Sequence, residues 1–222
     1  MNGVIGELLP LALGIAISPI PIIAAILMLL SPRARTNSIG FAIGWTAGVA
    51  LATVVFTLLS SLIAQPAGGP SPLVGWVKIV LGVLLVLLAV AQWRKRPRPG
   101  HDVASPQWMA AIDTMSAAQA CGLGFVLSAA NPKNLMMAVS AGVTIGTARL
   151  GGGAVTIAIL VFVILSITTV AVPVIAFLVA PGTLERPLGR LREWLTANNA
   201  VVMCVLLLLI GVVSIGKGIA AI

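Results

Sequence analysis

Six apolar stretches, each long enough to cross a lipid bilayer, limit most strongly how this chain can fold. They cover residues 4–30, 38–64, 73–93, 119–145, 151–180 and 198–221. Because an α-helix rises 1.5 Å per residue, about 20 apolar residues span a hydrocarbon core of ~30 Å. Only 8% of the residues are charged and the mean hydropathy is +1.15, which excludes an ordinary soluble domain. The sequence predicts an all-α integral membrane protein with six transmembrane helices.

The basic residues predict how these helices are oriented. Nine of the 13 lysines and arginines follow the first, third and fifth stretches: Arg33, Arg35, Arg94, Lys95, Arg96, Arg98, Arg186, Arg190 and Arg192. Lys78, Arg149 and Lys217 lie on the other side, where the two lysines are near enough to helix ends to reach the interface. Cytoplasmic loops carry the excess of basic residues. Both termini are therefore expected outside the cytoplasm, and the basic segments are expected to face anionic inner-leaflet lipids rather than nucleic acid.

This topology divides the chain into two halves of three helices. The halves are residues 1–93 and 119–222, and a basic cytoplasmic linker, 94–118, joins them. Since the first half enters the membrane from outside and the second from inside, any structural repeat between them must be inverted. A proline lies near the middle of the first helix of each half, at Pro19 and Pro132. Interrupted helices at corresponding points of two halves indicate a midplane binding site, so helices 1 and 4 are predicted to be broken.

Seven residues around the two prolines are predicted to bind substrate. Proline removes a backbone donor and frees carbonyls inside a helix, and in hydrocarbon these must be satisfied by protein or by a water-filled cavity. The first break carries three of the predicted residues and the second carries four: Ser18, Pro19 and Pro21, then Asn131, Pro132, Lys133 and Asn134.

Lys133 is the strongest single indication of function. It lies about a dozen residues from either end of its stretch, and a charge near the bilayer centre costs ~2.5–3.5 kcal/mol even on insertion scales. It must face a cavity, a partner or a substrate. None of the five acidic residues lies deep in a stretch: Glu7, Asp102, Asp113, Glu185 and Glu193. A buried lysine without a carboxylate either loses its proton or binds an anion, and an anionic substrate suits it.

Two further patterns concern packing. Gly40, Gly44 and Gly48 are spaced four residues apart and permit close helix contact, either within one chain or between two. Residues 184–195 place leucines on one stripe and basic residues around the rest, which predicts an amphipathic helix lying on the inner leaflet.

At the proline motifs the chain resembles the LysE superfamily of small exporters. The matching features are Ser18-Pro19-Ile20-Pro21, the Asn131-Pro132-Lys133 motif and the three-plus-three arrangement of spans. Within that superfamily it most resembles the GAP/Sap group, the glycopeptidolipid- and sulfolipid-addressing proteins. The residues that carry this closer resemblance are 18–49, 131–135 and the basic linker.

The resemblance implies export of a lipid, glycolipid or lipid-linked glycan from the bacterial plasma membrane toward the cell envelope, and it favours a homodimer. Relatives in the superfamily move amino acids or metal ions, and others pass reducing equivalents through cysteine pairs beside the prolines. Cys121 and Cys204 are not such a pair, and the stretches offer no set of carboxylates or histidines for a metal. We expect no cofactor, no metal and no enzymatic activity. A small-solute exporter and a non-transporting membrane scaffold remain as alternatives.

Overall fold

The computed structural model describes residues 1–63, 72–94, 111–180 and 185–222. Every regular element in these ranges is helical, as predicted. The α-helices are α1 (Asn2–Ala16), α2 (Pro19–Leu29), α3 (Ala34–Ile63), α4 (Pro72–Arg94), α6 (Ala117–Ala129), α7 (Pro132–Thr147), α8 (Gly152–Val179) and α9 (Glu185–Ile219). A short 3₁₀ helix, η1 (Ile112–Thr114), precedes α6.

Four of the described helices, α3, α4, α8 and α9, are long and apolar enough to cross a membrane. The bent pair α1 and α2 makes a fifth span if the two are taken together. Many large apolar side chains on these helices are exposed, which is the surface expected of helices that contact lipid. The chain is therefore a multi-pass membrane protein. The fourth predicted stretch, 119–145, corresponds to most of α6 and α7, and α6 has only 13 residues.

Both predicted helix breaks are present. α1 ends at Ala16, α2 begins at Pro19, and the two axes differ by 53°. In the second half α6 ends at Ala129 and α7 begins at Pro132. A proline at the first position of a helix has no amide to leave unpaired and a φ suited to the helix. Each proline therefore ends one helix and starts the next.

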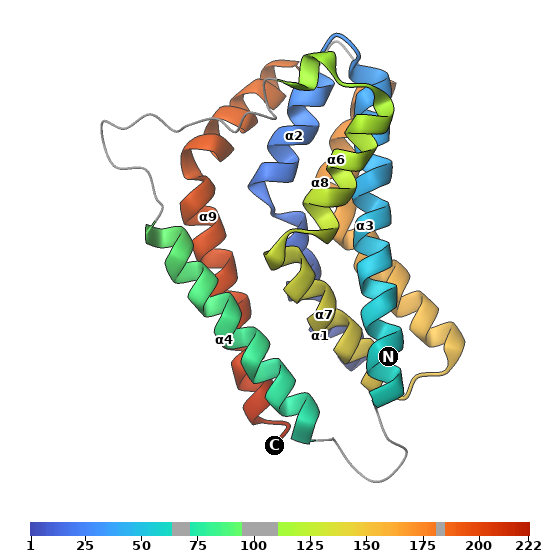
Figure 1. The fold of residues 1–222 in the computed structure, drawn as a ribbon, viewed down its shortest axis with the longest axis vertical. Coiled ribbons are helices and arrows are strands. Elements are labelled where there is room, and N and C mark those ends of the chain that lie inside the picture. Colours follow the sequence, from blue (N-terminus) through green and yellow to red (C-terminus); the bar gives the residue numbers. More distant parts are fainter. Residues whose placement is uncertain (64–71, 95–110, 181–184) are drawn as a thin grey trace.

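The two halves run in opposite directions (Figure 1). α1 and α2 run from the end that carries the chain termini toward the other end, whereas α6 and α7 run back from it. The junction between α1 and α2 and the junction between α6 and α7 both lie near mid-height. The two breaks are therefore at corresponding depths in the molecule.

Glycines bring two helix pairs into backbone contact, and each pair takes one helix from each half. α3 packs against α6 along Gly40, Gly44 and Gly48, where an added Cβ would meet backbone or side-chain atoms of Ala117, Cys121 and Ser128. α4 packs against α9 in the same way, through Gly75 and Gly82 facing Gly218 and Gly211. The glycine stripe at 40–48 thus serves packing within one chain.

The prediction of a separate surface helix at 184–195 was wrong for its described part. α9 runs without a break from Glu185 to Ile219. Leu188 and Leu195 are buried and pack in one cluster with residues of α2, among them Ile26. The leucine stripe is therefore largely a packing face against α2.

Most of the predicted linker, 95–110, lies outside the described residues. The part next to α6 is packed on the bundle. Ile112 is buried, and Asn37 Nδ2 of α3 donates a hydrogen bond to Met115 O at 3.1 Å. The segment just before residue 119, the predicted start of the second half, is thus hydrogen-bonded to α3 of the first half.

Candidate functional site

Lys133 links the two helix breaks. Its side chain projects from the first turn of α7, is only 3% exposed, and donates from Nζ to Gly14 O of α1 at 2.6 Å. In a continuous helix Gly14 O would accept from the Ser18 amide, but α1 ends at Ala16. A helix C-terminus carries partial negative charge, which favours a cation beside it. Of the cavity, partner or substrate expected beside Lys133, the structure supplies a partner, and that partner is the backbone of the other half.

The second break satisfies the corresponding carbonyl in a different way. Asn134 Nδ2 donates to Leu127 O at 3.2 Å. Leu127 precedes Pro132 by five residues, as Gly14 precedes Pro19. The position in the first break that corresponds to Asn134 is Pro21, which has no donor. The first break therefore takes its donor from the second half.

Thr169 supplies a second such donor to the first break. Its Oγ1 donates to Ala16 O, the last residue of α1, at 2.5 Å. Thr169 lies on α8, so α7 and α8 both contribute a polar side chain to the end of α1. Sequence reasoning missed this residue because a threonine within an apolar helix more often bonds to its own helix.

The other predicted residues form the walls of the two breaks. Asn131 caps α7, since its Oδ1 accepts from the Lys133 amide at 3.0 Å. Pro132 is exposed. Ser18, Pro19 and Pro21 are buried at the start of α2. The seven residues thus lie at the two junctions, and Lys133 is the one among them whose side chain bonds across to the other half.

Asn134 keeps one unused polar atom. Its side chain is 2% exposed, and its Oδ1 has no hydrogen-bond partner within the described part of the chain. Most buried polar atoms in native proteins are paired. An unpaired acceptor one residue from a buried cation gives this break both a positive donor and a free acceptor.

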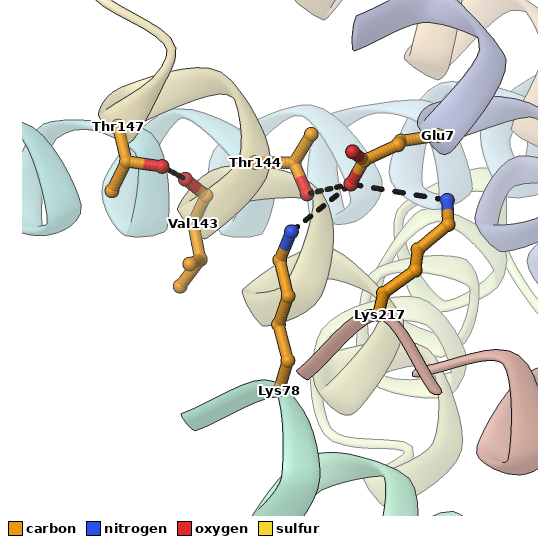
Figure 2. Close-up of polar contacts among 6 residues, drawn as sticks. All are labelled: Glu7, Lys78, Val143, Thr144, Thr147 and Lys217. Carbon is orange, nitrogen blue, oxygen red and sulfur yellow. Dashed lines mark hydrogen bonds and ion pairs between the residues drawn. The ribbon is translucent and has the colours of Figure 1, made fainter. Parts of the chain in front are cut away.

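A second polar cluster, which sequence reasoning missed, lies at the end of the bundle that carries the termini. Lys78 Nζ of α4 donates to Glu7 Oε2 of α1 at 3.1 Å, and Lys217 Nζ of α9 lies 3.8 Å from the same oxygen. Thr144 of α7 also donates to it, at 3.5 Å. Figure 2 shows the three side chains converging on Glu7. We call these four residues the Glu7 cluster.

Lys78 and Lys217, which the sequence places near helix ends, both approach Glu7, and their side chains stay 16% and 36% exposed. The sequence did contain a signal for the Glu7 cluster, because Glu7 is an acidic residue inside an apolar stretch and each lysine also interrupts one. What the sequence could not give is that the α4–α9 contact and the position of α1 bring all three charges together.

Comparison with known proteins identifies the family. The model of the family described as Sap, sulfolipid-1-addressing protein, matches residues 8–220. The chain belongs to this family. The match confirms the resemblance to the GAP/Sap group and supports a lipid-related role in the membrane. No curated protein and no solved structure matches the chain.

Proposed function

We propose that this chain moves an anionic lipid or glycolipid across the plasma membrane toward the cell envelope, by alternating access around the two helix breaks. The family name refers to a sulfolipid. A sulfated head group is an anion and an acceptor of hydrogen bonds, which suits a buried ammonium. The substrate class we propose is therefore a sulfated or otherwise anionic glycolipid.

The opposite directions of the two halves support an inverted repeat. In this proposal α6 and α7 together form the fourth span in chain order, equivalent to the first span, α1 and α2. α3 would then correspond to α8, and α4 to α9. Broken helices at equivalent midplane positions are the common site of substrate binding in transporters with inverted repeats.

The hydrogen bond between Lys133 and Gly14 is the observation that carries the proposal. It joins the breaks of the two halves and leaves Lys133 almost without solvent contact. In this proposal we assign that arrangement to the occluded state of the cycle. An ammonium has three donors, and Gly14 O is its one acceptor within the described residues. An anionic head group would take the place of this carbonyl, and Asn134 Oδ1 would accept from a sugar hydroxyl.

In this proposal the lipid tail lies in an apolar groove between two helices. An open groove between α3 and α8 is lined almost entirely by apolar residues: Ile39, Ala42, Ile43, Thr46, Ala47, Ala50, Ala171, Val174 and Ile175. A tail lying there would stay in contact with the bilayer while the head group crosses. This arrangement favours a lipid over a small solute, since a small solute needs no lateral opening.

The test is lipid exchange in proteoliposomes. The probe is a sulfated galactosylceramide with a nitrobenzoxadiazole label, and dithionite quenches only the label in the outer leaflet. Wild type should bring the inner-leaflet probe within reach of dithionite. Lys133→Ala should slow this by about tenfold or more, because a charge-assisted hydrogen bond contributes ~1.5–3 kcal/mol. Unsulfated labelled galactosylceramide should move more slowly than the sulfated probe.

Arg149→Ala is the matched control, since it removes an exposed cation far from the breaks in sequence and should leave exchange unchanged. Equal exchange by wild type and Lys133→Ala would contradict the proposal. No exchange above protein-free liposomes, with both proteins folded, would favour a membrane scaffold instead.

Location and assembly also belong to the proposal. We place both termini outside the cytoplasm, in a bacterial plasma membrane, with the basic segments facing anionic inner-leaflet lipids. The homodimer favoured by the family resemblance stays a prediction, and so does the absence of a cofactor and of enzymatic activity.

A further inference from the structure

The Glu7 cluster holds more positive than negative charge. Lys78 and Lys217 bring two ammonium groups to one carboxylate, and both approach the same oxygen, Oε2. A carboxylate has two oxygens and room for about four hydrogen bonds. One carboxylate cannot neutralise two cations, so the cluster keeps one uncompensated positive charge.

The cluster lines a pocket that also contains an unpaired donor. The pocket lies between α1, α4, α7 and α9 and includes Ser140 and Ser214 beside the four cluster residues. Ser140 is 6% exposed, and its Oγ has no hydrogen-bond partner within the described residues. A buried hydroxyl without a partner costs stability. The lining of this pocket therefore offers an unused hydroxyl donor together with two ammonium groups.

We propose that this pocket is a second binding site, for an oxyanion of the sulfate or phosphate class, separate from the helix breaks. Lys78 and Lys217 would bind the anion, and the Ser140 hydroxyl would donate to one of its oxygens. Glu7 occupies the lysines when no anion is present, so the anion and the Glu7 carboxylate compete for the same donors.

The residue types select for an oxyanion. A metal ion would need several carboxylate, histidine or thiolate ligands, and among the described residues that line this pocket Glu7 is the one such ligand. The two lysine ammonium groups and the serine hydroxyl supply the hydrogen-bond donors that an oxyanion needs. The lysine side chains are 16% and 36% exposed, so an anion can reach them from outside the bundle.

The site deepens the proposed function and rests on it in one respect only. If the chain exports an anionic lipid, a site at the terminal end of the bundle would receive the head group after it leaves Lys133. Binding of an oxyanion to the pocket does not itself require transport.

The experiment measures equilibrium binding of radiolabelled sulfate to the purified, detergent-solubilised full chain in a scintillation-proximity assay. Lys78→Gln and Lys217→Gln should each weaken sulfate binding by about tenfold or more. Glu7→Gln should tighten it, because the competing carboxylate is gone. Arg149→Gln, which removes an exposed cation outside the cluster, should leave sulfate binding unchanged. The unfolding temperature without sulfate checks that each variant is folded, and Lys217, the more exposed lysine, serves if Lys78→Gln does not fold.

A structural ion cluster and a binding site give opposite results for Glu7→Gln. Weaker or unchanged binding by Glu7→Gln, or absence of saturable sulfate binding to wild type, would overturn the proposal. Tighter binding by Glu7→Gln together with weaker binding by the lysine variants supports it. Failure of lipid exchange with sulfate binding intact would refute the proposed function and leave the oxyanion site standing.

Competition identifies where the anion comes from. Dihexanoyl phosphatidic acid and inorganic phosphate are titrated against bound sulfate. Displacement by the lipid at concentrations where phosphate has no effect assigns the site to a lipid head group. Equal displacement by both assigns it to a free anion.

Discussion

Lys133 Nζ lies 2.6 Å from Gly14 O, although the two residues are 119 positions apart in the sequence. A side chain of the second half thus satisfies a carbonyl that the proline break of the first half leaves free. The same hydrogen bond that completes the end of α1 holds the proposed substrate-binding group away from solvent. Opening the site must therefore expose a carbonyl and a cation at the same time.

Lys133→Met should leave the protein as stable as wild type or raise its free energy of unfolding by about 1–2 kcal/mol. The substitution leaves Gly14 O unpaired, which costs ~1–3 kcal/mol, but it removes a buried charge whose desolvation costs several kcal/mol. Denaturant titration of the solubilised protein measures the difference. A large loss of stability would mean that Lys133 serves mainly to hold the fold together.

Thr169→Val, unlike Lys133→Met, should destabilise the protein. It removes the donor to Ala16 O without removing any charge, so the free energy of unfolding should fall by ~1–3 kcal/mol. Lipid exchange should continue, because Thr169 is not proposed to contact the head group. If Thr169→Val abolished lipid exchange while the protein stayed folded, Thr169 as well as Lys133 would be needed for transport. The assignment of a purely structural role to Thr169 would then be wrong.

Gly44→Ala should lower stability by about 1–3 kcal/mol, as overpacking of a tight contact does. An alanine Cβ there would collide with the backbone carbonyl of Cys121, which cannot move without shifting α6. Gly122→Ala on α6 is the matched control, since a Cβ at that position meets nothing within 4 Å. Equal unfolding free energies for the two variants would show that α3 and α6 can move apart at Gly44 without loss of stability, which would contradict the prediction.

Cysteine labelling tests the orientation. With Cys121 and Cys204 replaced by alanine, Arg149→Cys in intact cells should react with a membrane-impermeant maleimide, whereas Arg35→Cys should react only after permeabilisation. Both positions are exposed and belong to opposite loops of the predicted topology. The reverse pattern would place the termini in the cytoplasm.

The breaks could be predicted from the sequence because proline acts locally. Pro19 and Pro132 remove backbone donors wherever the helices lie, so the ends of α1 and α6 follow from the residues themselves. The seven predicted site residues are found at those two junctions for the same reason.

The partners of the charged groups could not be predicted, because they depend on which helices meet. Lys133 donates a hydrogen bond to the main-chain carbonyl of Gly14. Because every residue has a main-chain carbonyl, the sequence does not indicate which residue accepts this hydrogen bond. Glu7, Lys78 and Lys217 are visible as charges in apolar stretches, but their meeting depends on the glycine contact between α4 and α9. The start of α9 was predicted too late because its polar first turns resemble a surface helix, although Leu188 packs against α2.

The glycine contacts also have a mechanical consequence. α3 belongs to the first half and α6 to the second, and likewise α4 and α9, yet in both pairs glycines bring the backbone of one helix against atoms of the other. Surfaces in such contact slide poorly, because every glycine would have to move past a bulkier neighbour. The rigid bodies of this protein are therefore expected to be pairs that combine both halves, and the hinges are expected at the proline junctions within α1–α2 and α6–α7.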